Sequence, residues 1–266
     1  IGGQFNMAKV IPGKEDYAET IRYYGRQIEL TGVKLHLNTR ASAESLKAAG
    51  FDEVVLATGV TPRKVNFDGA DHPKVLDYAQ VLYKKVPVGQ KVAIVGAGGI
   101  GFDMAEFLAH DHNVPSPSLH TTEYMKEWGV DMGYSEGGAL QGAQPLPSAR
   151  EIYLLKRSTG KHGKKLGKTT GWIHRASLAM KQVNMIGNVS YEKVDDAGLH
   201  ITVNDEPQVL EVDHVVICAG QEPLRELQAD LESVGMSVHL IGGSNEAAEL
   251  DAKRAIYEAA HLAAGM

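Results

Sequence analysis

The sequence has a single cysteine, Cys218, among its 266 residues. It therefore has no C-x-x-C pair, which excludes a dithiol redox centre and an iron–sulfur or zinc site built within this chain. Cys218 lies in the apolar run Val215–Ala219, which predicts a buried and unreactive strand thiol. So little cysteine is typical of a reducing compartment, and we expect a cytoplasmic protein.

Excess positive charge and long apolar runs are lacking as well. The formal net charge is −6, which argues against a nucleic-acid partner. No apolar run is long enough to cross a bilayer and no signal peptide is present, so no membrane partner is expected. The chain opens at Ile1, without an initiator methionine, and we expect it to be a piece of a longer polypeptide.

The strongest positive signal is the stretch Lys91–His110. Four apolar residues, Val92–Val95, predict a buried parallel strand, and an amphipathic helix pattern begins behind them. Between the two, Gly96, Gly98 and Gly101 have the G-x-G-x-x-G spacing. In a dinucleotide-binding loop the first glycine makes the turn, the second lets backbone approach the pyrophosphate, and the third lets helix and strand pack closely. Because the motif follows a strand and opens a helix, it predicts a dinucleotide site rather than another glycine-rich turn.

The remaining pattern predicts an α/β chain around this motif. Helices are expected at Lys14–Leu30, Glu44–Ala48, Trp172–Lys181 and Leu250–Ala264. Strands are expected at Val33–Asn38, Val54–Ala57, Glu151–Leu155, Val215–Ala219 and Val238–Ile241. Three short strands, with turns at 195–198 and 204–207, predict an antiparallel meander at Val189–Val194, Leu199–Val203 and Val209–Val212.

Residues 111–149 break the pattern, because residues 112–148 hold four prolines and few apolar runs. We expect an insertion without regular structure there, and we call residues 111–149 the insertion. Trp128 and Tyr134 either fix the insertion to the domain or only pack within it.

One strand–turn unit occurs twice. Asp52–Gly59, with Pro62, and Asp213–Gly220, with Pro223, each combine an acid, a buried strand, a small residue and a glycine. This repeat indicates two related Rossmann-like domains, with parallel sheets and helices on both faces. We expect the first part of one domain at 1–87, a second domain at 88–213 that contains the insertion, and a return to the first domain at 214–266.

The order of these motifs resembles that of the two-dinucleotide flavoproteins, the family of thioredoxin and glutathione reductases. The similarity is closer to one branch, the C-terminal region of bacterial 2,4-dienoyl-CoA reductases. It runs the whole length of the chain and rests on the stretches Ile1–Asn6, Ile11–Lys14, Leu166–Arg175 and Val216–Pro223. The resemblance implies an electron-input module in which hydride passes from NADPH to FAD. It also implies an N-terminal flavin barrel of the same polypeptide, with FMN and a 4Fe–4S cluster, that reduces 2,4-dienoyl-CoA in unsaturated fatty acid β-oxidation.

By this resemblance, residues 1–87 and 214–266 form an FAD-binding domain without its first βαβ unit, and residues 88–213 bind NADPH. The residues implied at the FAD are Gly3, Gln4, Lys14, Ala41, Thr58, Gly59, Gly243, Ser244 and Asn245. The family usually has an aspartate where Asn245 stands, and an amide bonds the ribityl chain with less charge assistance. The residues expected at the NADPH are Gly96, Gly98, Gly99, Ile100, Gly101, Lys156, Arg157 and Lys168.

Two basic residues, Lys156 and Arg157, follow the strand Glu151–Leu155 where an acid would favour NADH. They predict a preference for the 2′-phosphate of NADPH. No acid–base catalyst is expected, because hydride transfer is the chemistry of the cofactors. On the predicted helix, His174 and Arg175 either steer phosphate or have a structural role. The alternative functions are a non-catalytic ADP-binding domain, as in trimethylamine dehydrogenase, and another flavin reductase, such as a glutamate synthase small subunit.

Overall fold

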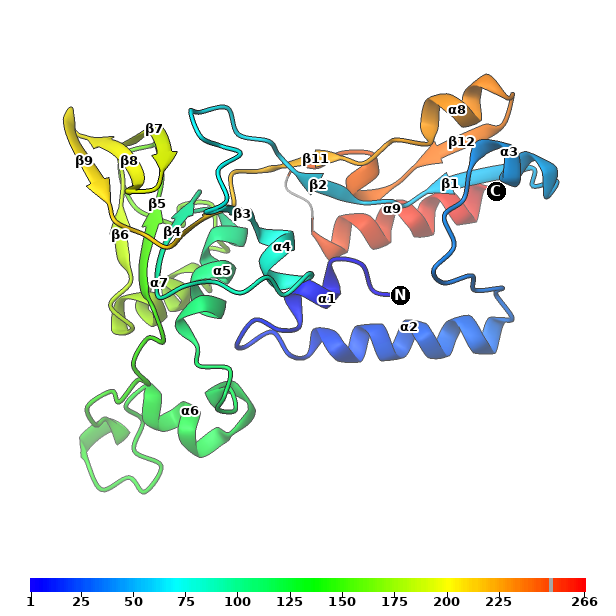
Figure 1. The fold of residues 1–266 in the computed structure, drawn as a ribbon. Coiled ribbons are helices and arrows are strands. Elements are labelled where there is room, and N and C mark those ends of the chain that lie inside the picture. Colours follow the sequence, from blue (N-terminus) through cyan, green and yellow to red (C-terminus); the bar gives the residue numbers. More distant parts are fainter. Residues whose placement is uncertain (249–250) are drawn as a thin grey trace. The chain divides into compact units, whose positions relative to one another are not determined.

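The computed structural model describes residues 1–248 and 251–266, shown in Figure 1. The chain divides into two compact units, and we describe each by itself. Unit 1 comprises Ile1, Gly25–Arg63 and Gly220–Met266, and unit 2 comprises Gly2–Tyr24 and Lys64–Ala219. Within the described ranges, no helix has the length and apolar character needed to cross a membrane.

Unit 2 is built on a five-stranded parallel sheet in the order β3-β10-β4-β5-β6. Its strands are β3 (Val75–Asp77), β4 (Lys91–Val95), β5 (Glu151–Leu155), β6 (Asn184–Ile186) and β10 (His214–Ile217). Val92, Ala93 and Ile94 are fully buried, because β4 is the middle strand and is covered on both faces. The predicted buried strand ahead of the glycine motif is therefore confirmed.

Outside the insertion and the shared helix α2 (Tyr17–Thr31), unit 2 contains the helices α1 (Phe5–Ala8), α4 (Tyr78–Leu82), α5 (Gly99–Ala109) and α7 (Gly171–Met180). The glycine motif opens α5. Phe102, Met104 and Leu108 of α5 are almost completely buried in the cluster that also holds Ile94 and Leu154 of the sheet. The apolar face predicted for this helix is thus the face that packs on β4 and β5.

The predicted antiparallel meander is also confirmed in unit 2, as β7 (Val189–Asp195), β8 (Gly198–Val203) and β9 (Glu206–Leu210). Its second turn is tighter than the expected 204–207. Asn204 and Asp205 both have positive φ, 51° and 69°, which makes a two-residue hairpin turn. Pro207 therefore falls inside β9, where it is tolerated because β9 is an edge strand.

The boundaries expected between the domains differ from those of the compact units. Residues 214–219 were assigned to the same domain as residues 220–266, but β10 pairs in parallel with both β3 and β4. The compact units divide after Arg63 and after Ala219, and residues 2–24 also fall in unit 2. The pairing partners of β10, and not its sequence, decide which sheet it joins, and the assignment of the cofactor-binding domains stays a prediction.

Unit 1 contains two small sheets. In one, β1 (Glu53–Leu56) pairs in parallel with β12 (Ser237–Leu240), and in the other β2 (Val60–Pro62) pairs antiparallel with β11 (Gln221–Pro223). Ala43, Leu56 and Leu231 form its buried core. The helices are α3 (Ala43–Ala48), α8 (Gln228–Ser233) and α9 (Ala252–Gly265), and α2 (Tyr17–Thr31) begins in unit 2 and ends in unit 1.

Two predictions made for this part of the chain are wrong. The segment Val33–Asn38 forms no strand, and Val33, Leu35 and Leu37 are 58%, 48% and 56% exposed. Its alternating pattern finds no strand to pair with among the described residues. The strand β1 does form, but only Leu56 in it is buried. The expected first residue of the last helix, Leu250, lies outside the described residues, and α9 begins after the N-cap Asp251.

The insertion has more regular structure than expected. It contains the 3₁₀ helices η1 (Pro117–Leu119) and η2 (Gly137–Ala139) and the helix α6 (Thr121–Glu127). The ring of Trp128 lies 6.4 Å from that of Trp172 on α7, so Trp128 does fix the insertion to unit 2. Tyr134 does not fix it, because its side chain is 79% exposed.

Candidate functional site

The glycine motif has the geometry that a dinucleotide loop needs at its first and last glycines. Gly96 has φ 109°, and a Cβ there would lie 2.6 Å from the carbonyl oxygen of Cys218. A Cβ on Gly101 would lie 1.8 Å from the carbonyl oxygen of Gly96. Both positions therefore admit only glycine, one for the turn and one for the approach of α5 to β4.

The other two glycines of the loop face open space. Apart from the adjoining backbone, no heavy atom of the described residues lies within 4 Å of a Cβ built on Gly98 or Gly99. Gly98 is the N-cap of α5, and the first N–H groups of a helix have no partner within it. An anion at this end of α5 would meet free N–H donors and the positive end of the helix dipole. The residues present thus fit a dinucleotide pyrophosphate, with Gly98, Gly99, Ile100 and Gly101 as the donor backbone.

The thiol next to this loop has no reactive environment. Cys218 is 5% exposed, and its N–H donates to the carbonyl oxygen of Val95 at 2.8 Å. Burial raises the pKa of the thiol, because the thiolate would lose its solvation. The predicted buried strand thiol is confirmed.

The basic residues expected at the 2′-phosphate follow β5, the strand beside β4. The ammonium of Lys156 donates to the carbonyl oxygens of Thr159 and Lys161, at 3.1 and 3.0 Å. This lysine therefore holds the loop in which it lies. Arg157 and Lys168 in the same connection are exposed, so their charges face solvent. A binding role for these three residues stays a prediction, and the geometry favours Arg157 over Lys156 for a phosphate contact.

The connection after β5 is fastened by a buried imidazole. Nε2 of His162 lies 3.2 Å from the carbonyl oxygens of both Leu154 and Ile186, so its N–H is shared between β5 and β6. Burial lowers the pKa of His162, which keeps the ring neutral. The imidazole therefore holds the loop that contains Arg157 against the ends of β5 and β6.

Two acids on α5 have cationic partners from other parts of unit 2. The ammonium of Lys14 lies 2.6 Å from a carboxylate oxygen of Asp103. Nδ1 of His174, on α7, donates to the carboxylate of Glu106 at 2.9 Å. Glu106 is nearly buried, and this hydrogen bond raises the pKa of His174. Of the two interpretations of His174, the structure supports the structural one. Arg175 is engaged too, since its guanidinium donates to the carbonyl oxygen of Gly163 at 3.4 Å.

Sequence reasoning did not find Asp103 or Glu106. The signal was present, because both acids interrupt an otherwise apolar helix three residues apart, on one face. A carboxylate buried on such a face needs a charged partner. The identity of the partners was hidden, because Lys14 and His174 are far away in the sequence.

In unit 1, all the residues implied at the FAD except Ala41 gather at one edge of the β1–β12 sheet. Parallel strands bring their carboxyl ends to the same edge, so the turn with Thr58 and Gly59 and the turn with Gly243 and Ser244 are neighbours. The hydroxyl of Ser244, which is completely buried, links the turns by donating to the carbonyl oxygen of Leu56 at 2.6 Å.

Two side chains of this edge are committed to the fold. The hydroxyl of Thr58 donates to the carbonyl oxygen of Leu224 at 2.5 Å, and the hydroxyl of Ser244 is used as described. Arg225, which sequence reasoning missed, donates to the carbonyl oxygens of Ser244 and Asn245. A ligand at this edge would therefore meet the backbone of the two turns and the exposed side chain of Asn245.

The remaining residues implied at the FAD are divided between the units. Ala41 lies in unit 1, directly before Ser42, the N-cap of α3. Gly3, Gln4 and Lys14 lie in unit 2, and Gln4 is the N-cap of the short helix α1. The FAD roles of all these residues stay predictions.

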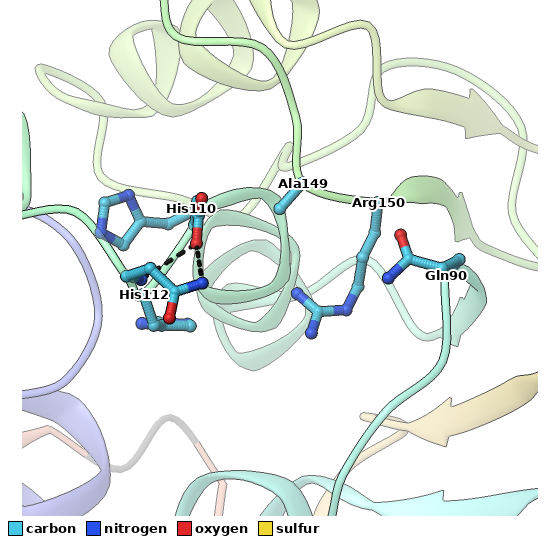
Figure 2. A pocket seen from close by; sticks show the side chains of 7 residues that line it. Gln90, His110, His112, Ala149 and Arg150 are labelled. Carbon is cyan, nitrogen blue, oxygen red and sulfur yellow. Dashed lines mark hydrogen bonds between the residues drawn. The ribbon is translucent and has the colours of Figure 1, made fainter.

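A pocket of about 350 Å³ lies at the far end of α5 from the glycine loop, where the insertion leaves and rejoins the sheet domain. Figure 2 shows Gln90 and Arg150 across from His110 and His112 in this pocket. The guanidinium of Arg150 donates to the carbonyl oxygens of Gly89 and Leu108, so it holds the base of the insertion. The pocket contains none of the residues expected at a nucleotide.

Known proteins resemble this chain over nearly all its length. It is 25% identical over 92% of its length to cinnamate reductase of Clostridium sporogenes, of which it covers 31%. It is 28% identical over its whole length to bilirubin reductase of Mediterraneibacter gnavus, of which it covers 35%. The chain thus spans about a third of the length of these relatives.

Solved structures share the fold. A complex of 2-naphthoyl-CoA reductase with 2-naphthoyl-CoA matches 97% of this chain with a TM-score of 0.74 and 27% identity, and the match covers 33% of that protein. Histamine dehydrogenase from Rhizobium sp. 4-9 matches 98% of the chain, and 38% of its own length, with a TM-score of 0.71 and 17% identity, which shows a shared fold.

The family model that matches describes a pyridine nucleotide-disulphide oxidoreductase, and the match covers residues 8–249. This range includes the glycine motif, the meander and both turns at the edge of the β1–β12 sheet. The predicted α/β fold with dinucleotide-binding architecture is therefore confirmed. The chain belongs to the pyridine nucleotide-disulphide oxidoreductase family, and this membership implies binding of FAD and NAD(P)H.

Proposed function

We propose that this chain is the electron-input module of an NADPH-dependent flavoprotein reductase that acts on 2,4-dienoyl-CoA. One observation carries the nucleotide part of the proposal. The open glycine loop lies between β4 and α5, and the exposed Arg157 lies two residues after the end of β5, the strand that pairs with β4. Free N–H donors suit a pyrophosphate, and a guanidinium suits a ribose 2′-phosphate because it can donate two parallel hydrogen bonds.

The residues of the chain would bind and orient the two cofactors and exclude water from them. Gly98 to Gly101 would hold the pyrophosphate of NADPH, and Arg157 and Lys168 would hold its 2′-phosphate. The turns with Thr58 and Gly59 and with Gly243 to Asn245 would hold the flavin and ribityl of FAD through backbone atoms. When bound, NADPH supplies a hydride that FAD accepts. No side chain here has to move a proton for that transfer, so positioning is the contribution of the protein.

The substrate class rests on two kinds of support. The stretches Ile1–Asn6, Ile11–Lys14 and Leu166–Arg175 resemble the dienoyl-CoA reductase branch. One structural relative above 25% identity is by name a reductase of an acyl-CoA. Since the chain spans about a third of its relatives, we assign the acyl-CoA site, FMN and the 4Fe–4S cluster to an N-terminal flavin barrel of the same polypeptide. We place the reaction in the cytoplasm, as the single buried thiol predicts.

Replacing Arg157 tests the nucleotide assignment. We expect Arg157→Ala to lower the affinity for NADPH about tenfold or more and to leave that for NADH nearly unchanged, because only NADPH has the 2′-phosphate. Lys165→Ala, in the same exposed loop, is the matched control. Titration of both nucleotides against both variants gives the affinities. An unchanged NADPH-to-NADH ratio in Arg157→Ala would make the site assignment wrong.

The alternative functions are outcomes of a second measurement. Bleaching of the bound flavin by NADPH supports the reductase. A protein that binds ADP and shows no bleaching is the non-catalytic nucleotide-binding domain. Bleaching without any 2,4-dienoyl-CoA turnover in the whole polypeptide indicates another flavin reductase, such as a glutamate synthase small subunit.

A further inference from the structure

A serine of the insertion, Ser118, is hydrogen-bonded to the loop that carries Lys14. The hydroxyl of Ser118, in η1, donates to the carboxylate of Glu15 at 2.7 Å. The same oxygen accepts the backbone N–H of Gly13 at 3.1 Å, and this N–H also donates to the other carboxylate oxygen of Glu15 at 2.9 Å. Gly13 and Glu15 are the two neighbours of Lys14, so a single hydroxyl bridges the chain on both sides of this lysine.

The insertion end of this bridge is itself anchored within unit 2. The hydroxyl oxygen of Ser116, a buried residue, lies 2.6 Å from the hydroxyl oxygen of Ser118, and the two form a hydrogen bond. Further along the insertion, the carboxylate of Glu127 lies 3.5 Å from the ammonium of Lys181 at the end of α7. The nearly buried Glu127–Lys181 pair and the ring contact of Trp128 with Trp172 fasten the insertion at both ends of α7. Residues 116–128 of the insertion are therefore held against α7.

The bridged lysine reaches the helix of the glycine loop. Its backbone N–H donates to the carbonyl oxygen of Ile11 at 2.9 Å, and Ile11 is almost completely buried. Its ammonium lies 2.6 Å from Asp103, two residues after Gly101. A long flexible side chain keeps such a geometry only if its backbone is held, because ordering it costs conformational entropy.

We propose that Ser118 is a positioning residue, and that the insertion serves to hold the Lys14 ammonium on Asp103 beside the dinucleotide loop. The proposal rests on the proposed function for its consequence, which is the transfer of hydride between NADPH and FAD. The bridge itself is a property of the chain that needs no cofactor.

A pair of isosteric variants separates the hydroxyl from the volume of the side chain. Ser118→Val removes the hydroxyl, and Ser118→Thr keeps it in a side chain of the same shape. In the whole protein without added nucleotide, we expect the amide hydrogen of Gly13 to exchange about threefold faster in Ser118→Val, because it loses one of its two acceptors and Glu15 loses the hydroxyl that holds it. Exchange should be normal in Ser118→Thr. Ser135→Val is the matched control, because the Ser135 hydroxyl also donates to a carboxylate of the insertion at 2.7 Å, that of Asp131. Equal Gly13 exchange in all three variants would overturn the bridge.

A double-mutant cycle with Lys14→Met tests whether Ser118 acts through the lysine. In the whole polypeptide loaded with FAD, we expect Ser118→Val to slow flavin reduction by NADPH on the order of tenfold, with Ser118→Thr near the parent rate. In the Lys14→Met background, Ser118→Val should have no further effect. If the double variant instead lost the product of the two single-variant rate factors, Ser118 would act independently of Lys14, and the positioning role would be overturned. If NADPH reduces no flavin in the parent protein, the proposed function fails, and the amide exchange of Gly13 still decides the bridge.

Discussion

The pair of Glu106 and His174 shows how one buried acid requires a hydrogen-bonding partner and shifts the pKa of that partner. Glu106 lies on α5 among Phe102, Met104 and Leu108, so its carboxylate is separated from water. The imidazole of His174 supplies the hydrogen bond that a buried carboxylate requires, and its own pKa rises as a result. Stability of unit 2 is thereby linked to pH.

We expect the free energy of unfolding to fall as the pH rises through the raised pKa of His174. The protonated ring is favoured in the folded state, so the contribution is complete below the ordinary pKa of about 6.5 and is lost at higher pH. In Glu106→Gln the loss should be smaller by on the order of 1 kcal/mol between pH 6 and 9. Urea denaturation at several pH values measures it.

The matched control is the pair of Glu53 and His239 in unit 1, whose atoms are 2.7 Å apart and whose side chains are more exposed. Glu53→Gln should leave the pH dependence nearly unchanged, because an exposed pair contributes little. A parent protein whose stability does not depend on pH between 6 and 9 would contradict the linkage.

At the scale of elements, the strand–loop–helix unit β4–α5 separates structural from binding glycines. Gly101 has the carbonyl oxygen of Gly96 against it, and Gly98 has open space. The loop has four glycines, Gly96, Gly98, Gly99 and Gly101, and only the surroundings of each distinguish the ones that the fold needs from the ones that a ligand would need.

We expect Gly101→Ala to destabilise unit 2 by about 2 kcal/mol or more, because the added Cβ overlaps backbone that has no room to move. Gly98→Ala should change the melting temperature little, since its φ of −85° suits alanine. Its methyl group would stand where the pyrophosphate approaches, so NADPH affinity should fall about tenfold or more. Thermal unfolding and NADPH titration of both variants give the two quantities, and normal NADPH binding by a folded Gly98→Ala would refute the loop assignment.

At the scale of the whole molecule, the two units differ in the elements that a dinucleotide-binding domain needs. Unit 2 has a five-stranded sheet and an intact glycine loop. In unit 1 the strand β1 pairs with β12, and the alternating apolar residues Val33, Leu35 and Leu37 are exposed. The sequence has one G-x-G-x-x-G fingerprint, and it belongs to unit 2.

We therefore expect this chain alone to bind NADPH and to hold FAD weakly or not at all. The pyrophosphate of FAD needs a glycine turn and a helix N-terminus of its own, and residues 1–87 and 214–266 have no such motif. Flavin absorbance of the purified chain and separate calorimetric titrations with FAD and NADPH measure this. Tight, stoichiometric FAD binding without NADPH binding would overturn both assignments.

We also expect the chain alone to reduce no 2,4-dienoyl-CoA with NADPH. One cysteine is too few to ligate a 4Fe–4S cluster, and the acyl-CoA site is assigned to the flavin barrel. The assay follows NADPH oxidation with the acyl-CoA present, and an artificial one-electron acceptor with added FAD is the control for hydride input. If this chain alone reduced the acyl-CoA, the assignment of the acyl-CoA site to the flavin barrel would be wrong.

The sequence by itself determined the elements whose signal is local. Strand β4, helix α5, the glycine turn and the meander follow from short-range periodicity and from backbone conformations that only certain residues adopt. The buried thiol of Cys218 followed in the same way, because an apolar run indicates an interior strand.

Only the tertiary structure decided the features that depend on partners distant in the chain. The strand expected at 33–38 required a neighbour to pair with, and the sheet that β10 joins was decided by β3 and β4. The partners of Asp103 and Glu106, and the bridge of Ser118 to the loop with Lys14, come from segments up to about a hundred residues away. Hydrogen bonds and ion pairs leave no periodic trace in a sequence, because their energy depends on where the chain returns in space and not on spacing along it.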